Sequence, residues 1–286
     1  MKNYRDFVRK IAEIQKEAGG IRPGGFPTPE IPPRSPDAPV GMIFSPHPDD
    51  ECINGGLPLR LRREAGFRII NVPVTFGSNR ERQKERMKDL TDACRFLGFG
   101  IEPAAPGGLA GITPSDREKN PKEWDQSVGV IARLLEKLRP RVLFFPHRFD
   151  RHPTHCGTHL LVADALRKMP TDFTCLTIEN EFWGALEDPN LLVELDEETV
   201  AELISALSFH LGEIRRNPYH LTYPSWLIDN VRRGAEIIGS RQGEAAPDFL
   251  FGVLHKASEF KNGRSSPLFP RGRFLPASNN SGSIFR

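Results

Sequence analysis

The sequence predicts an α/β fold in which helices cover both faces of a mostly parallel sheet. From Val40 onward, short apolar runs alternate with longer stretches of helical periodicity, which is the pattern of βαβ units. The chain also has 286 residues, of which 38% are hydrophobic, and this is enough to build the core of one large domain. The elements can therefore be taken in order along the chain.

The first 39 residues differ in composition from the rest. Residues 1–20 have the pattern of an amphipathic helix with charged side chains throughout. Residues 19–39 are rich in Pro and Gly, which remove backbone donors and interrupt regular structure. We therefore expect residues 1–39 to form an N-terminal helix followed by a Pro-rich arm.

The next segments define the expected domain. Strands are predicted at residues 40–45, 67–75, 141–146 and 175–183. Helices are predicted at residues 56–66, 80–98, 121–140, 158–169, 196–216 and 225–239. After about residue 258 the chain turns to Ser, Asn, Gly and Pro with little periodicity. We therefore predict a Rossmann-like three-layer domain over residues 40–258 and a loose C-terminal tail over residues 259–286.

Charge and cysteine content limit the function classes. The 39 Lys and Arg residues nearly balance the 37 Asp and Glu residues, so the net charge of +2 gives no reason to expect a nucleic-acid or membrane partner. The four cysteines lie far apart in sequence, which favours neither a disulfide framework nor a thiolate zinc site. No apolar run approaches the ~20 residues of a membrane span. We expect a cytoplasmic protein with a small-molecule substrate, and the sequence leaves open whether it forms a homo-oligomer.

Two polar clusters follow predicted strands. His47-Pro48-Asp49-Asp50-Glu51 comes directly after the strand at 40–45, and residues 147–159, "HRFDRHPTHCGTH", come after the strand at 141–146. Ligands of an open parallel sheet gather beyond the carboxyl ends of its strands. Both clusters could therefore direct His and carboxylate side chains into one crevice, which is the arrangement of a metal site.

The residue types in the clusters are those that zinc prefers. Imidazole and carboxylate ligands suit Zn²⁺, and a catalytic zinc takes three protein ligands and leaves one position for water. His47, Asp50 and His155 would supply three ligands. Alternatively, His47 and Asp50 cap a helix and the second cluster is a solvated loop. His155 and His159, four residues apart, could also form a ligand pair on one helix face, and the spacing does not decide between these possibilities.

The segments "PHPDDE" and "HPTH" resemble the PIG-L/LmbE-like family of zinc-dependent N-deacetylases, and the similarity extends over about residues 40–251. A third segment agrees with the family's R-x-x-E-x-x-x-A-x-x-x-L-G helix at Arg86, Asp89, Ala93, Leu97 and Gly98. The resemblance implies one zinc ion per chain with His47, Asp50 and His155 as its ligands. It further implies that Asp49 is the general base, that His152 lies on the opposite side of the scissile carbonyl, and that Arg86 contacts substrate hydroxyls. It leaves His159 in a packing role.

Two positions depart from the family pattern. Thr154 stands where the family has Asp, so a carboxylate that would favour a charged neighbouring imidazole is missing, and His152 is expected to act as a neutral donor unless Asp150 reaches it. Asp89 replaces a Glu, and Arg86 could pair with it instead of with substrate. Glu51 is expected to bond to a ligand or to begin a helix, where the dipole favours an anion.

The function that these residues and the resemblance imply is zinc-dependent removal of an N-acetyl group, most plausibly from an N-acetylglucosamine-type amino sugar or its conjugate. A hydratase that uses the same site is one alternative. A non-catalytic metal- or sugar-binding protein is the other, although pure binding would not require Asp49 and His152. Phe182 and Trp183 could stack on a sugar face or simply belong to the core.

Overall fold

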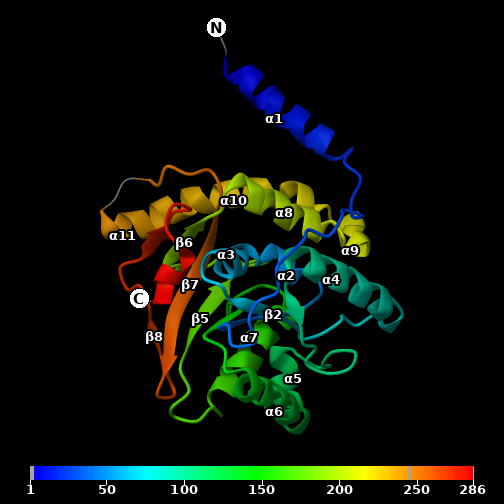
Figure 1. Ribbon diagram of the computed structural model, residues 1–286, viewed down its shortest axis with the longest axis vertical. Helices are drawn as coiled ribbons and strands as arrows, with labels where there is room; N and C mark the ends of the chain where they lie inside the picture. The colour runs from blue at the N-terminus through cyan, green and yellow to red at the C-terminus, as the bar shows by residue number, and fades with distance from the viewer. Residues whose placement is uncertain (1–2, 244–245, 286) are drawn as a thin grey trace.

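The computed structural model describes residues 3–243 and 246–285, and it is built around one mixed sheet (Figure 1). The strands in the described residues are β1 (Val40–Ser45), β2 (Arg68–Pro73), β3 (Gly100–Ile101), β4 (Val142–Pro146), β5 (Cys175–Asn180), β6 (Leu191–Glu194), β7 (Gly252–Lys261), β8 (Arg264–Pro267) and β9 (Arg273–Leu275). Their order in the sheet is β3-β2-β1-β4-β5-β7-β6-β9, with β8 paired to β7. The strands from β3 to β5 are all parallel, whereas β7 runs antiparallel to both of its neighbours in that order. The predicted α/β fold with a mostly parallel sheet is confirmed.

Helices cover both faces of this sheet. The helical elements are α1 (Tyr4–Ala18), α2 (Asp50–Ile53), α3 (Gly56–Glu64), η1 (Arg80–Arg82), α4 (Gln83–Leu97), α5 (Pro114–Lys119), α6 (Pro121–Leu138), α7 (Pro153–Leu166), α8 (Glu197–Leu207), α9 (Leu211–Arg216), α10 (Tyr219–Gly234), η2 (Ala235–Gly239), α11 (Ser240–Gln242) and η3 (Ser281–Phe285). In Figure 1, α8 and α10 lie above the sheet and α5 and α6 lie below it. Among the described residues, no helix combines the length and apolar character needed to cross a lipid bilayer.

Alternation along β1 divides the core into two layers. Ile43 packs with residues of α3, α4 and α8 on one face, whereas Met42 and Phe44 pack with residues of α6 and α7 on the other. Successive side chains of a strand point to opposite faces, so a strand buried on both faces reads as an unbroken apolar run. The segment "VGMIF" is such a run, and all six residues of β1 are buried.

Several predicted boundaries move. The helix predicted at 158–169 begins at Pro153, so His155 lies in its first turn. The helix predicted at 196–216 is two helices, because the helical conformation is interrupted between Leu207 and Leu211. The strand predicted at 175–183 ends at Asn180 and leaves Phe182 and Trp183 in the following loop. These shifts place side chains at the end of the sheet where parallel strands terminate.

The prediction of a loose tail over residues 259–286 is wrong. Its proposed boundary falls inside β7, and β9 pairs in parallel with β6. Leu275 and Ile284 have 0% exposure and belong to the same core cluster as Ile43. A few apolar side chains spaced far apart among polar residues were enough to dock the segment, although they show no periodicity.

The N-terminal segment has the predicted elements, a helix and then an irregular arm. Helix α1 has no buried residue and projects away from the rest of the chain (Figure 1). The arm is held to the body by hydrogen bonds that include those from Gly24 N to Ser208 Oγ and from Arg34 Nη2 to Arg62 O. The division at residue 39 stays a prediction.

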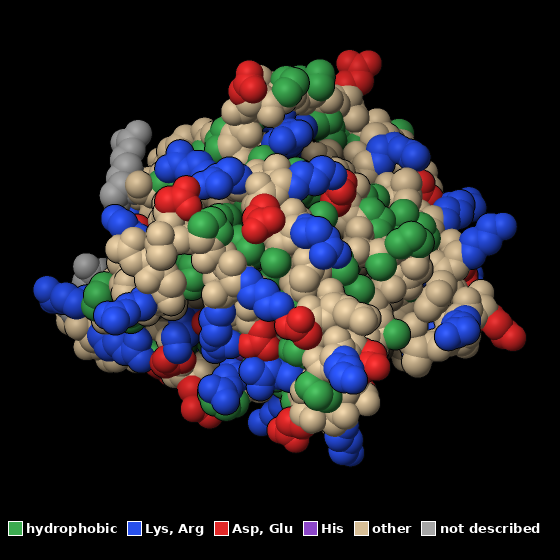
Figure 2. Space-filling view, turned by 90° about the horizontal axis from the view of Figure 1, so that it is seen from below, with side chains coloured by type: hydrophobic (Ala, Val, Ile, Leu, Met, Phe, Trp, Pro, Cys, Tyr) green, Lys and Arg blue, Asp and Glu red, His purple; other side chains and the backbone are tan. Residues whose placement is uncertain are grey.

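Figure 2 shows acidic and basic side chains interspersed on the lower face, so neither sign of charge covers that face.

Candidate active site

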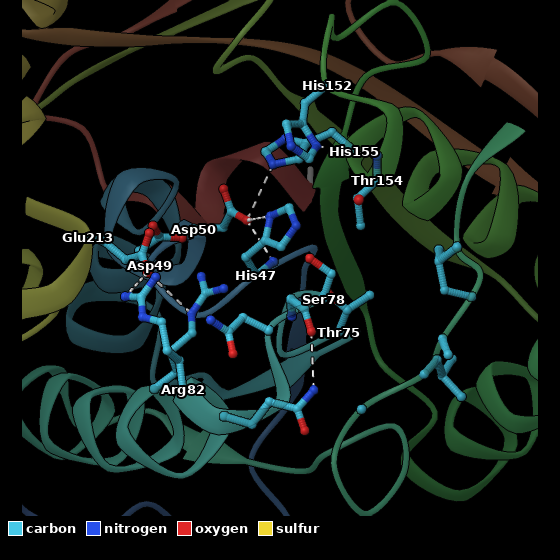
Figure 3. A pocket seen from close by; sticks show the side chains of 18 of the residues that line it. His47, Asp49, Asp50, Thr75, Ser78, Arg82, His152, Thr154, His155 and Glu213 are labelled. Atoms are coloured by element: carbon cyan, nitrogen blue, oxygen red, sulfur yellow. Dashed lines mark hydrogen bonds and ion pairs between the residues drawn. The ribbon is translucent and has the colours of Figure 1, made fainter. Parts of the chain in front are cut away.

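A cleft of about 1110 Å³ opens at the carboxyl ends of β1 and β4. These strands are neighbours in the sheet although β2 and β3 lie between them in sequence, so this is the point where the strand order reverses. Ligands of doubly wound sheets bind at such a point. Both polar clusters of the sequence lie in this cleft, together with side chains from α4, α9 and α10 (Figure 3).

The loop after β1 turns sharply into α2. Asp49 has φ 125° and ψ −30°, a backbone conformation that a residue with a Cβ atom rarely adopts. Its amide donates to Glu51 Oε2 at 2.9 Å, and the amide of His47 donates to Asp50 Oδ2 at 2.9 Å. The carboxylates of Asp50 and Glu51 thus satisfy the backbone amides of His47 and Asp49. The turn directs Asp49 and Asp50 to different partners.

The donor set around Asp50 fits a metal ion. Asp50 Oδ2 lies 3.7 Å from His47 Nδ1 and 3.6 Å from His155 Nε2. Asp50 and His155 are each 1% exposed, yet Asp50 Oδ1 and both ring nitrogens of His155 have no hydrogen-bond partner in the described residues. Buried polar atoms are normally satisfied, so unpartnered atoms of two adjacent side chains indicate a missing ligand. Carboxylate and imidazole are donors that zinc accepts. His47, Asp50 and His155 would therefore hold a zinc ion.

Asp150 lies beside the ring of His155 and reaches the ring of His152 only through its charge, as the last-ranked influence on the pKa of His152. Asp150 Oδ2 lies 3.5 Å from His155 Nδ1, and both side chains are almost fully buried. A carboxylate beside one ring nitrogen keeps the proton there and leaves the other nitrogen free to bind a metal. Asp150 Oδ1 accepts the backbone amide of His152. The idea that Asp150 could replace the carboxylate missing at position 154 is therefore not supported by this geometry.

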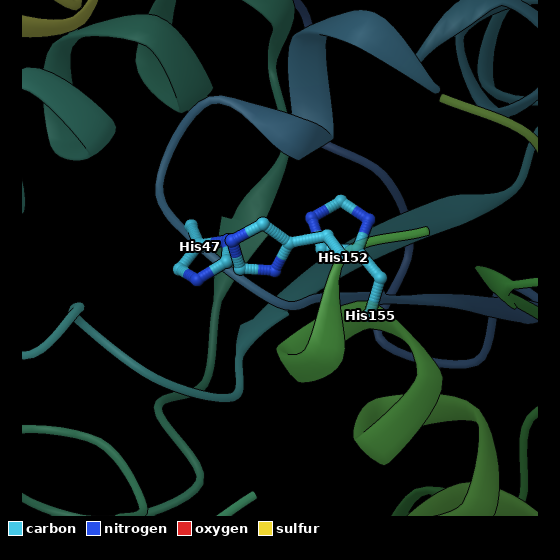
Figure 4. A group of neighbouring side chains, drawn as sticks. All are labelled: His47, His152 and His155. Carbon is cyan, nitrogen blue, oxygen red and sulfur yellow. The ribbon is translucent and has the colours of Figure 1, made fainter. Parts of the chain in front are cut away.

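His152 lies against the two other histidines, as Figure 4 shows. Its ring centroid is 4.9 Å from that of His47 and 5.0 Å from that of His155, and ligand atoms of the three residues lie within 4.8 Å of one another. His152 Nδ1 accepts the amide of Thr154 at 3.3 Å. In a neutral ring the proton must then be on Nε2, which makes Nε2 a donor and not a metal ligand. Burial, followed by the nearby imidazoles, lowers the pKa of His152 to about 4, which agrees with a neutral donor.

Asp49 is held by a residue that the sequence reasoning missed. The Tyr219 hydroxyl donates to Asp49 Oδ2 at 2.6 Å from α10. Burial and then the Asp50 carboxylate raise the pKa of Asp49, whereas the bond from Tyr219 opposes this rise. Burial beside Asp49 also raises the pKa of Tyr219, so this phenol stays protonated and remains a donor. No local sequence pattern around Tyr219 indicated this contact.

Glu51 supports Asp49 and does not contact the cluster of three histidines. Its Oε2 accepts the Asp49 amide, and its Oε1 accepts His210 Nε2 at 2.7 Å and Cys52 Sγ at 3.3 Å. His210 is 1% exposed. Burial would lower the pKa of His210, but Glu51 raises it overall. Glu51 and His210 therefore form a buried hydrogen-bonded pair, and Glu51 in turn holds the backbone amide of Asp49.

Arg86 pairs with α9 and not with Asp89. Its Nη2 donates to Pro48 O at 3.2 Å, and its Nε lies 3.5 Å from Glu213 Oε1. The guanidinium lines the cleft next to the loop of residues 47–51, where a bound molecule could reach it. Figure 3 shows Glu213 and Arg82 on the Asp49 side of the cleft, with His152 and Thr154 on the other side.

The aromatic pair after β5 separates into two roles. Both rings line the cleft, but Phe182 is half-buried and packs against the core, whereas Trp183 is 50% exposed. The ring of Trp183 lies 6.0 Å from that of His152. The alternative that assigned both aromatics to the core is therefore wrong for Trp183.

His159 is not part of the histidine cluster. Its Nδ1 faces Pro146 O at 3.1 Å, and its ring packs 5.6 Å from that of Phe145. The alternative of a ligand pair formed by His155 and His159 therefore has no support in the structure.

Comparison with known proteins gives a family match for part of the chain. Residues 42–166 match the family described as "PIG-L: GlcNAc-PI de-N-acetylase". A 1D-myo-inositol 2-acetamido-2-deoxy-alpha-D-glucopyranoside deacetylase of Mycobacterium leprae is 26% identical over 156 residues, which are 46% of this chain and 51% of that protein. A probable N-acetyl-alpha-D-glucosaminyl L-malate deacetylase 2 of Bacillus cereus is 23% identical over 189 residues, 60% of this chain and 82% of that protein. This chain thus spans about half the length of its mycobacterial relative.

Solved structures share the fold. The zinc-inhibited form of teicoplanin deacetylase Orf2 superimposes with a TM-score of 0.57 at 13% identity, covering 79% of this chain and 98% of that one. GalB, the 4-carboxy-2-hydroxymuconate hydratase of Pseudomonas putida, gives 0.56 at 14% identity, covering 77% and 95%. The matched residues 42–166 include β4, most of β1 and both polar clusters. Residues 42–166 of the chain therefore match the PIG-L family, and the solved structures support the same fold.

Proposed function

We propose that this chain is a zinc-dependent hydrolase that removes the N-acetyl group of an amino sugar conjugate of the N-acetylglucosamine type. The observation that carries the proposal is the placement of Asp49 and His152 on either side of the donor set His47, Asp50 and His155 (Figure 3). The deacetylase names of the curated relatives support the reaction type and the sugar. One zinc ion per chain and a location in the cytoplasm are parts of the same proposal.

Amide hydrolysis requires a nucleophilic water, a polarised carbonyl and a proton for the leaving amine. Zinc, when bound, supplies Lewis acidity that polarises a carbonyl and makes water nucleophilic near neutral pH. Asp49 accepts the proton of the attacking water and then passes it to the nitrogen of the leaving amine. Because Tyr219 occupies Oδ2 of Asp49, we assign this proton to Oδ1. Tyr219 and Glu51 also fix the orientation of the carboxylate before the substrate arrives.

His152 acts on the opposite side of the carbonyl. Its Nε2–H donates a hydrogen bond to the oxygen that gains negative charge, while the Thr154 amide holds the ring through Nδ1. Trp183, half-exposed beside His152, offers a flat apolar surface to the sugar ring. Asp150 keeps the proton of His155 on Nδ1, so Nε2 stays available as a donor to the metal.

The test is release of amine and acetate. The purified chain, supplied with zinc, should liberate free amine and acetate in equal amounts from N-acetylglucosamine glycosides, and a chelator should abolish the reaction. Asp49→Asn should lower the rate by about 10²-fold or more, since it removes the proton acceptor but keeps the size of the side chain. Water addition to an unsaturated acid without amine release would instead favour the hydratase. Binding of zinc and sugar without either reaction would favour the non-catalytic alternative.

A further inference from the structure

One wall of the cleft contains four arginines, Arg80, Arg82, Arg86 and Arg216, which we call the arginine wall. Arg80 and Arg82 come from η1, Arg86 from α4 and Arg216 from the end of α9. Glu213 is the carboxylate within this group. Arg82 Nη2 lies 2.8 Å and Arg86 Nε 3.5 Å from Glu213 Oε1, and Arg216 Nη2 bonds to Glu213 Oε2. Three guanidinium groups face the single carboxylate of Glu213, and Arg80 adds a fourth positive charge to the wall.

The other carboxylates of the cleft balance only part of this charge. Asp49 lies close enough to Arg86 for their charges to interact, and Asp50 faces the histidines. Asp116 accepts the hydroxyl of Thr113 at 2.5 Å at the far edge of the lining. A positive wall within a cleft attracts anions, because the low-dielectric surroundings weaken screening by solvent.

Holding α9 against α4 does not account for all four arginines. Glu213 is 7% exposed, and the Arg82 and Arg86 side chains are 27% and 12% exposed. The ion pairs of Glu213 with Arg82 and Arg86 are therefore largely shielded from solvent. The Arg216 side chain is 65% exposed, and Arg80 is also exposed, yet both line the cleft. Guanidinium groups match carboxylate and phosphate through paired hydrogen bonds, which makes arginine the residue suited to such ligands.

The wall lies next to the catalytic loop. Arg86 Nη2 donates to the carbonyl oxygen of Pro48, the residue before Asp49, and Figure 3 shows Arg82 and Glu213 on the Asp49 side of the cleft. Ser78 and Gln83 line the same region with groups that can bond to sugar hydroxyls. A sugar whose acetamido group reaches Asp49 would therefore have its remaining substituents near the arginine wall.

We propose that the arginine wall binds an anionic group carried by the substrate, so that the substrate class is an N-acetyl amino sugar conjugated to a carboxylate or a phosphate. This inference rests on the proposed function and narrows it. Arg80 and Arg216 determine the specificity, because they are the exposed members, whereas Arg82 and Arg86 are the less exposed partners of Glu213. The B. cereus relative has an acidic malate group in the name of its substrate, which is consistent with this class.

The experiment compares three derivatives of N-acetylglucosamine that differ only in the substituent at the anomeric carbon: the methyl glycoside, the carboxymethyl glycoside and the 1-phosphate. We expect kcat/KM for at least one of the two acidic compounds to exceed that for the methyl glycoside by about tenfold or more, since a hydrogen bond to a charged group has this effect. The acidic compound that is preferred identifies carboxylate or phosphate as the natural group. Raising the salt concentration should reduce the preference.

The variants separate specificity from folding. In the double variant Arg80→Gln/Arg216→Gln, the ratio of acidic to methyl kcat/KM should fall about tenfold or more. The matched control is Arg215→Gln, because Arg215 is exposed beside Arg216 but does not line the cleft, and its ratio should match the parent. Equal kcat/KM for all three compounds, or an unchanged ratio in the double variant, overturns the inference while leaving the deacetylase intact.

Binding gives a readout that does not require turnover. Titration calorimetry with glucosamine 1-phosphate, the carboxymethyl glycoside of glucosamine and methyl glucosaminide should show about tenfold tighter binding of at least one acidic amine, and the double variant should lose this difference. If no compound releases amine, the proposed function fails, and the calorimetric comparison still decides whether the wall binds anions. Equal affinities for all three amines contradict the inference.

Discussion

Substitution of Asp49 and Asp50 gives the sharpest test of the roles in the catalytic loop. The two residues are adjacent in sequence, and the structure gives them different surroundings. Asp49 is bonded to Tyr219 and lies outside the donor set, whereas Asp50 Oδ2 lies 3.7 Å and 3.6 Å from nitrogens of His47 and His155. Asn substitutions keep the size of each side chain and remove only its charge. The two variants should therefore fail in different ways.

Asp49→Asn should keep its zinc and lose turnover. The amide oxygen of the substituted side chain could still accept from Tyr219, so the turn should persist, but the group can no longer accept a proton. General bases contribute about 10²–10⁴-fold, which corresponds to roughly 3–5 kcal/mol of transition-state stabilisation. Asp50→Asn should instead lose metal affinity. Groups that only orient ligands change metal affinity by about 10–100-fold, and a direct ligand should change it by more than that.

The measurement is zinc stoichiometry after dialysis against a metal buffer, together with the deacetylase rate at saturating zinc. Parent and Asp49→Asn should each hold about one zinc per chain, and Asp50→Asn should hold much less. The roles are reversed if Asp49→Asn loses zinc while Asp50→Asn retains it. Full turnover of Asp49→Asn would refute the proposed proton transfer.

Three further predictions concern other side chains. His155→Ala should lose zinc whereas His152→Ala should retain it and lose rate, which elemental analysis and kinetics would check; equal zinc in both variants contradicts the assignment of the ligands. Trp183→Ala should raise KM for the sugar about two- to tenfold with a smaller change in kcat, and an unchanged KM would show that the ring does not contact substrate. Burial lowers the pKa of His255 from 6.5 to about 3, so the fold should lose stability as the pH falls from 6.5 toward 3, because the unfolded chain binds a proton there that the folded chain does not. Between about pH 6.5 and 5 the loss should be about 2 kcal/mol, and urea unfolding of His255→Leu should show a correspondingly smaller loss, whereas parallel curves would argue against a neutral buried imidazole.

Local features of the sequence predicted most of the sheet that holds the site. The strand at residues 40–45 and the helix at 121–138 have unbroken apolar or helical periodicity, and both form where the pattern indicates. The two polar clusters could be assigned to one crevice because parallel strands end at the same edge of a sheet. The tail could not be predicted in this way, since Leu275 and Ile284 are apolar residues scattered among polar ones.

The sequence by itself determined the residue types of the site: three imidazoles, two adjacent carboxylates and the turn that separates the carboxylates. Only the tertiary structure decided what holds and surrounds them. Tyr219 bonds to Asp49 across 170 positions, and His210 bonds to Glu51 across 159. Arginines from η1, α4 and α9 meet at Glu213. Periodicity reports which face of an element is buried, but contacts between distant elements depend on how their helices pack, and packing is a property of the whole core.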